Sequence, residues 1–309
     1  MNSRKWIKIW FILLVSFILL TFFFIFFLHN YKNVPLRFTN SISFDAKLSF
    51  LNKSNTFNNA EILIVGSSMG LNNINSEIIS KGLNKNVLNI SSWGMKVNQV
   101  YSLLKLLDLS KVKTVIYLNQ YFDLYSLQLE AYNEKEIKEY LYENNSIPGY
   151  LNTFSSLSSK FKDYLEWKKR YLDNKKYSSL LFNNYGDIQL LINEENSSLD
   201  RWNAITDITN NKEQFKVLEE VFHYLEEKGI EFYSVTTPYR NSFLENDEFI
   251  KQYDPYVKKS KILSDKFNFS YINLQNSLNL EDEYFADSSH LNYKGGNLVS
   301  KELIKYLSR

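Results

Sequence analysis

Residues 61–71, with the sequence EILIVGSSMGL, decide the predicted fold. Residues 62–65 are apolar and rich in β-branched side chains, which is typical of a strand buried in a parallel sheet. The strand pattern ends at GSSMG (residues 66–70), and a helical pattern follows from about residue 75. A strand that turns directly into a helix places side chains and free backbone N–H groups at the carboxyl edge of the sheet. This geometry suits a nucleophilic serine, and a small-residue turn without chemistry fits the stretch equally well.

Short apolar segments and helical patterns alternate along much of the chain. This alternation predicts an α/β fold, in which a parallel sheet is covered by helices on both faces. A binding site is then expected at the carboxyl ends of the strands. The expected strands are residues 61–65, 86–90, 113–118, 230–236 and 270–274, and the expected helices are residues 75–82, 97–108, 212–228, 247–266 and 294–308.

Residues 124–210 interrupt this alternation. They carry patterns of amphipathic helices that are rich in Tyr, Phe and Trp, and they follow the third expected strand. We expect a helical insertion on the side of the sheet where a site would lie. It is either a lid or acceptor-binding subdomain, or a packing of helices without a direct role.

Residues 9–28, IWFILLVSFILLTFFFIFFL, contain no charged side chain. As a helix they extend about 30 Å, which is the thickness of the hydrocarbon core of a bilayer. A cleaved signal peptide has a shorter apolar region followed by small residues, whereas HNYK follows here. We therefore expect an uncleaved transmembrane anchor.

The basic residues Arg4, Lys5 and Lys8 precede this span. By the positive-inside rule, residues 1–8 form a cytoplasmic tail and the chain after the span is extracytoplasmic. Residues 29–58 are polar and weakly patterned, so we expect a stem that leads to a globular domain at 59–309.

The composition excludes several classes of protein. With 44% hydrophobic and 23% charged residues, the chain can form a packed core. The net charge is only +2, which gives no reason to expect a nucleic-acid partner. The absence of cysteine excludes disulfides, thiolate zinc sites and a cysteine nucleophile. A phosphate-binding turn at residues 66–70 is a weaker alternative, because no lysine follows it.

A second informative stretch is FADSSHLNYKGGN, residues 285–297. It places Asp287 three residues before His290. His29 lies at the membrane boundary and His223 lies among glutamates on an expected helix, so His290 is the histidine in a loop beside a carboxylate. A serine hydroxyl needs a nearby base, and an imidazole needs a partner that fixes its tautomer. Asp287 or a backbone carbonyl could supply that partner; alternatively, Asp287 caps a turn and His290 is an ordinary surface residue.

The GSSMG sequence formally matches the G-x-S-x-G elbow of α/β-hydrolases. In that family, however, the serine follows several strands, and the acid and the histidine lie on separate loops. Here the serine follows the first strand, and the acid and base lie three residues apart near the carboxyl end. The order of the motifs therefore excludes that family.

The motifs resemble those of the SGNH/GDSL hydrolase family instead. That family has Gly-Asp-Ser or a variant after strand one and Asp-x-x-His before the last helix. The resemblance implies Ser68 as the nucleophile, His290 as the base and Asp287 as the acid that orients it. It also implies an oxyanion hole made by the backbone N–H groups of Ser68 and Gly94.

A side-chain amide after strand three, Asn119 or Gln120, would complete that oxyanion hole. The usual Gly-x-Asn-Asp signature is missing there, and Ser67 replaces the frequent Asp of the first motif. The resemblance further implies a flavodoxin-like three-layer fold, here with a transmembrane helix and a helical insertion, and a mechanism that requires no metal or organic cofactor.

The anchor and the DSSHLN ending look most like the membrane-tethered branch of the family that acts in cell-surface glycan acylation. That likeness implies an O-acyltransferase, for example of acetyl groups, or an esterase. Its partners would be a surface polysaccharide and a multi-spanning membrane acyltransferase that supplies the acyl group. The alternative is a catalytically inactive scaffold that binds glycan or the membrane partner.

Overall fold

The computed structural model describes residues 3–54, 59–125, 133–156, 165, 180–192, 197 and 212–308. Parts of the predicted insertion, residues 126–132, 157–164, 166–179, 193–196 and 198–210, lie outside the described residues. The chain divides into two compact units. One comprises Met1–Asn52 and Ala131–Lys169, and the other comprises Lys53–Glu130 and Arg170–Arg309.

The larger unit contains the parallel sheet that the alternation predicts. Its strand order is β2-β1-β3-β4-β5, and every pair of neighbours is parallel. This order is that of flavodoxin-like doubly wound sheets: β2 is added on one side of β1, and β3, β4 and β5 are added on the other side. The strands are β1 (Ile62–Gly66), β2 (Val87–Asn89), β3 (Thr114–Asn119), β4 (Glu231–Thr236) and β5 (Ser270–Asn273).

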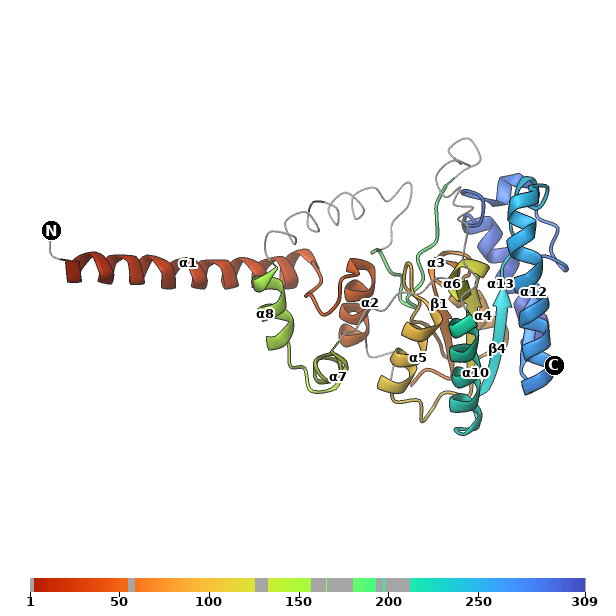
Figure 1. The fold of residues 1–309 in the computed structure, drawn as a ribbon, viewed down its shortest axis with the longest axis horizontal. Coiled ribbons are helices and arrows are strands. Elements are labelled where there is room, and N and C mark those ends of the chain that lie inside the picture. Colours follow the sequence, from red (N-terminus) through yellow and green to blue (C-terminus); the bar gives the residue numbers. More distant parts are fainter. Residues whose placement is uncertain are drawn as a thin grey trace. The chain divides into compact units, whose positions relative to one another are not determined.

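Helices cover both faces of this sheet and give three layers (Figure 1). The helices α4 and α13 pack on one face, where Ile79 and Val299 join Ile62, Ile64 and the alternate residues of the other strands in one core cluster. The helices α5, α10 and α12 pack on the opposite face. The helices of this unit are α3 (Ser68–Asn72), α4 (Ser76–Leu83), α5 (Val97–Leu106), α6 (Tyr121–Tyr125), α10 (Lys212–Glu226), α11 (Asn241–Leu244), α12 (Asp247–Phe267) and α13 (Tyr293–Leu307), with a 3₁₀ turn at Asp282–Tyr284.

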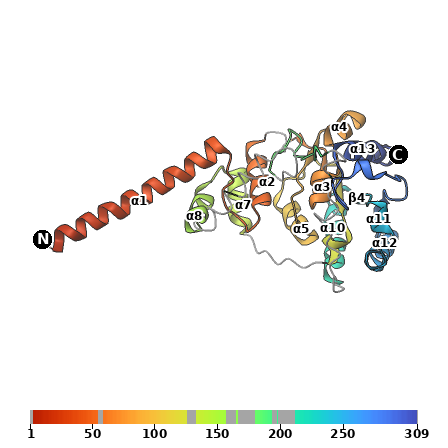
Figure 2. The same cartoon turned by 90° about the horizontal axis from the view of Figure 1, so that it is seen from above.

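The smaller unit is helical and contains α1 (Ser3–Lys32), α2 (Ile42–Lys53), α7 (Glu134–Tyr142) and α8 (Ile147–Ser155). Helix α1 is long and apolar enough to cross a membrane, which is compatible with a single-pass anchor or a signal sequence. The stretch expected as a stem contributes α2, whose Phe44 and Leu48 are buried. Helix α8 lies beside the C-terminal part of α1 (Figure 2).

Candidate active site

The first site element is the junction between β1 and α3. Gly66 ends the strand with φ 148°, and a Cβ at this position would overlap the carbonyl oxygen of Leu118 on the neighbouring β3. Only glycine allows the two strands to approach this closely while the backbone turns. Ser67 then caps α3 by accepting a hydrogen bond from the N–H of Met69, and Ser68 is the first helical residue. Ser68 is half-buried.

The second site element is the loop before α13. His290 and Asp287 are buried, and the Nδ1 atom of His290 lies 2.8 Å from Oδ2 of Asp287. The backbone N–H groups of Ser289 and His290 also donate to Oδ1 of Asp287. Burial opposes ionisation of this carboxyl, but the imidazole and the two backbone donors outweigh it and lower the pKa of Asp287. The ionised carboxylate holds the proton of a neutral imidazole on Nδ1, which leaves Nε2 as the basic atom.

A buried asparagine joins the two elements, although they lie more than 200 residues apart in the chain. Asn73, at the end of α3, donates from Nδ2 to the carbonyl of Ser289 at 2.8 Å and to the hydroxyl of Thr237 at 3.0 Å. Its Oδ1 accepts from the N–H of Leu291 at 2.8 Å. The side chain of Asn73 therefore fixes the backbone on both sides of His290 against the helix that begins with Ser68.

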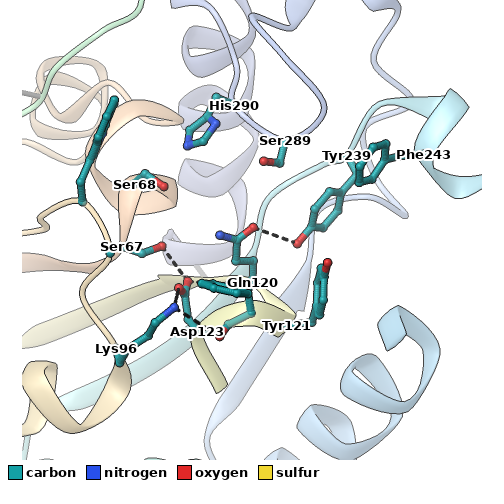
Figure 3. A pocket seen from close by; sticks show the side chains of 13 residues that line it. Ser67, Ser68, Lys96, Gln120, Tyr121, Asp123, Tyr239, Phe243, Ser289 and His290 are labelled. Carbon is teal, nitrogen blue, oxygen red and sulfur yellow. Dashed lines mark hydrogen bonds and ion pairs between the residues drawn. The ribbon is translucent and has the colours of Figure 1, made fainter. Parts of the chain in front are cut away.

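Four of the predicted site residues line one pocket of about 130 Å³ at the carboxyl ends of the strands (Figure 3). They are Ser68, Gly94, Gln120 and His290. Asp287 lies behind His290 as its hydrogen-bond partner. In the part of the chain that the structure describes, no hydrogen bond joins the Ser68 hydroxyl to the imidazole. Catalytic hydrogen bonds are often long in unliganded proteins and shorten when substrate binds.

The two alternatives for the side-chain amide differ in position. Asn119 is buried away from the pocket: its Nδ2 donates to the hydroxyl of Ser234, and its Oδ1 accepts from the hydroxyl of Tyr256. Gln120 lines the pocket, and its Oε1 accepts from the hydroxyl of Tyr239 at 3.4 Å. With the oxygen held by Tyr239, the amide N–H₂ of Gln120 is turned towards the side of Ser68 (Figure 3).

Gly94 follows β2 and is exposed at the edge of the pocket. Its φ is 73°, in the left-handed region that glycine adopts without strain. The preceding residue, Trp93, also lines the pocket, and its ring centroid lies 6.5 Å from that of His290. Its indole N–H donates to Asn72 at 2.7 Å, which fixes the ring at the pocket wall.

The sequence motifs do not predict a buried charge cluster at the base of the pocket, formed by Asp123 and Lys96. Asp123 accepts from the hydroxyl of Ser67 at 2.6 Å and from the N–H of Gln120 at 3.2 Å, and it lies 3.5 Å from Nζ of Lys96 (Figure 3). Burial raises the pKa of Asp123 and lowers the pKa of Lys96. The ammonium also lies 3.6 Å from the ring centroid of Phe122.

This cluster connects the three strand ends that carry the predicted oxyanion donors. Ser67 precedes Ser68 after β1, Lys96 follows Gly94 by two residues after β2, and Asp123 binds the backbone of Gln120 after β3. The sequence signal is weak, because isolated charged residues after strands are usually solvent-exposed.

Comparisons with known proteins add a similarity of fold. No protein-family model matches the sequence, and no curated protein matches it. The structure is similar to the crystal structure of the lipase/acylhydrolase from Enterococcus faecalis, at 12% sequence identity and a TM-score of 0.42. The similarity covers 80% of this chain and 95% of that chain. At this level of similarity the comparison does not bear on activity.

The fold and the site together define the class of this protein. It is a doubly wound α/β protein whose strand ends gather a serine, a histidine with a buried carboxylate partner, and a glycine and a glutamine beside them. These are the residue types that nucleophilic acyl transfer requires.

Proposed function

We propose that this protein is a serine esterase or O-acyltransferase of the SGNH type, with Ser68 as nucleophile, His290 as base and Asp287 as the residue that orients the base. One observation carries the proposal. Ser68 and His290 line the same small pocket, and Asn73 holds the loop of His290 against the helix of Ser68. Two adjacent serines are candidates for the nucleophile, and their surroundings favour Ser68. The hydroxyl of Ser67 is buried and donates to Asp123, whereas Ser68 is half-buried at the pocket.

The chemistry follows from these positions. The oxygen of Ser68 attacks the carbonyl carbon of an ester while Nε2 of His290 takes the hydroxyl proton. The tetrahedral intermediate collapses, the leaving alcohol receives that proton, and the acyl group remains as an ester on Ser68. Water or a sugar hydroxyl then attacks this ester while His290 takes its proton, and the imidazolium returns that proton to the oxygen of Ser68 as the acyl group leaves. Asp287 stays ionised and stabilises the imidazolium in both steps.

The oxyanion of the intermediate needs hydrogen-bond donors. The backbone N–H groups of Ser68 and Gly94 and the amide of Gln120 would supply them. We assign the side-chain donor of the oxyanion hole to Gln120 and not to Asn119, because the side chain of Asn119 is hydrogen-bonded to Ser234 and Tyr256. The loss of one such donor typically lowers kcat by about 10²–10³.

The proposed substrate is a polysaccharide of the cell surface, which accepts the acyl group in a transferase or loses one in an esterase. The helix α1 supports a membrane-bound location, and the basic residues before it support an extracytoplasmic site by the positive-inside rule. A multi-spanning membrane acyltransferase is the proposed acyl donor. These assignments derive from the resemblance of the motifs to the glycan-acylating branch of the SGNH family.

A fluorophosphonate probe tests the nucleophile directly. We expect the detergent-solubilised full chain to be labelled and Ser68→Ala to remain unlabelled. Ser67→Ala should still be labelled, since it keeps the Ser68 hydroxyl, but more slowly, since it loses the hydrogen bond to Asp123 and the cap of α3. Labelling of Ser68→Ala would remove Ser68 from the mechanism. Failure of the wild-type chain to react would favour the alternative of an inactive scaffold.

The hydrolysis of p-nitrophenyl acetate distinguishes an O-acyltransferase from an esterase. A transferase hydrolyses this ester slowly, and addition of an acceptor polysaccharide should raise the rate of nitrophenol release and yield an acetylated sugar. An esterase shows no such stimulation. Ser68→Ala should abolish the activity in both cases.

A further inference from the structure

Helix α8 is an apolar element on the surface of the smaller unit. Its sequence, IPGYLNTFS, contains no charged residue. Ile147 is 66% exposed and Leu151 is 52% exposed, four residues further along the same face. Adjacent exposed apolar side chains on a charge-free helix form a candidate contact surface for an apolar partner.

The helix packs on α1 through a row of aromatic contacts. The ring of Phe154 stacks on Phe22 with centroids 4.9 Å apart. The ring of Tyr150 lies 6.5 Å from Phe26 and 6.0 Å from His29. The contacts therefore extend along the part of α1 that ends its apolar stretch.

The segment that follows α1 also contacts α8 closely. Gly149 is buried, and a Cβ there would overlap the ring of Phe38, in the segment that follows α1. The hydroxyl of Thr153 accepts from the N–H of Arg37 at 3.0 Å. The position of α8 beside α1 is therefore set by close packing rather than by a flexible connection.

The position of Phe22 sets the depth of α8. The apolar stretch of α1 ends at Leu28, six residues after Phe22. At about 1.5 Å per residue, Phe22 lies about 9 Å inside that boundary when α1 spans a bilayer upright. Because Phe154 stacks on Phe22, the C-terminal end of α8 lies at the depth of the acyl chains.

The end of α8 is suited to such an environment. A helix terminus leaves carbonyl groups without intrahelical partners, and these are costly in a bilayer. Here hydroxyl groups bind carbonyls of the last turn: Ser155 and Ser156 donate to that of Asn152 at 3.0 and 2.6 Å, and Ser156 also lies 3.4 Å from that of Thr153. Ser and Thr side chains satisfy freed backbone groups in membrane helices in the same way.

We propose that α8 inserts into the lipid leaflet around the C-terminal end of α1, with Ile147 and Leu151 in contact with lipid. The chain then has a second membrane element besides α1, contributed by the inserted segment after β3. Lipid is the occupant that the structure favours, because Phe154 of α8 stacks on Phe22 within the apolar stretch of α1, whose neighbouring side chains Phe23 and Phe24 are exposed. This inference rests on the proposed membrane-spanning role of α1 and is independent of the catalytic activity.

The absence of cysteine in the chain allows a direct test. Single cysteines are introduced in the full chain by Leu151→Cys, by Leu191→Cys as a matched control, and by Phe23→Cys as a reference in α1. Leu191 is a leucine of similar exposure, 59%, in the larger unit, and Phe23 is 69% exposed. Each cysteine carries an environment-sensitive fluorophore. The proteins are reconstituted in phosphatidylcholine vesicles with or without lipid that bears a spin label on its acyl chain.

We expect the spin-labelled lipid to quench the fluorophore at Leu151→Cys to an extent comparable with Phe23→Cys and clearly more than at Leu191→Cys. Ile147→Cys provides a second label on the same face, should the first variant not fold. Quenching at α8 no greater than at Leu191→Cys overturns the proposal. If that result is accompanied by protection of Leu151→Cys from a soluble maleimide in native membranes, the face binds a membrane protein rather than lipid.

Discussion

The substitution Asn73→Ala examines how the site is held together. The side chain of Asn73 is fully buried and is the hydrogen-bond partner of the Ser289 carbonyl and the Leu291 N–H, on either side of His290. Alanine removes both partners from groups that water does not reach. A buried backbone group left without a partner costs about 1–3 kcal/mol.

The two groups together give a destabilisation of about 2–6 kcal/mol. For a domain of about 150–250 residues, each kcal/mol lowers Tm by about 2–4 °C, so Tm should fall by at least about 4 °C. The loop of His290 also loses its fixed position. Because a displacement of about 1 Å can lower the rate by about 10², we expect kcat for p-nitrophenyl acetate to fall at least tenfold at a temperature well below Tm.

The matched control is Asn75→Ala. Asn75 caps α4 and accepts from the N–H groups of Glu77 and Ile78, with no contact to the loop of His290 among the described hydrogen bonds. Loss of an N-cap costs about 0.5–2 kcal/mol, so Tm should fall while kcat is maintained. The reasoning is refuted if Asn73→Ala keeps the wild-type kcat, or if its Tm does not fall.

Three further outcomes follow from the site and the sheet. Removal of one partner from a buried ion pair costs about 3–5 kcal/mol. Asp123→Asn leaves Lys96 unpaired and should therefore lower Tm more than the double variant Lys96→Met/Asp123→Asn. A lower Tm for the double variant would show that the two side chains are not coupled. The pKa of Asp287 lies below its ordinary value of 3.8, so this carboxylate stabilises the fold above that pH and the contribution is lost as the pH falls through the lowered pKa. The Tm difference between wild type and Asp287→Asn should therefore shrink on acidification to about pH 3, and a constant difference would contradict this linkage. Gly66→Ala should not yield folded protein by circular dichroism, because its Cβ would overlap the Leu118 carbonyl; a wild-type spectrum and Tm would refute the close approach of β1 and β3.

Local patterns in the sequence determined the sheet and its strands. Each apolar segment is short and is flanked by helical periodicity. Residues within a few positions of each other are therefore enough to predict it as a buried strand. The structure confirms the parallel sheet and the α/β class. The first and last motifs, GSS and DSSH, predicted the two loops that meet at the carboxyl edge of the sheet, because strand topology alone brings such loops together.

The sequence did not determine what holds those loops together. Asn73 and Asp123 are ordinary polar residues in the sequence, and their roles depend on partners that are distant in the chain, at Leu291 and Ser67. The orientation of Asn119 and Gln120 likewise depends on tertiary packing. Successive residues at a strand end face opposite sides. The hydroxyl of Ser234 binds Asn119 away from the pocket, whereas the hydroxyl of Tyr239 binds Gln120 beside it. Side-chain hydrogen bonds between distant segments leave no periodic signal in the sequence, and for this reason only the three-dimensional structure reveals them.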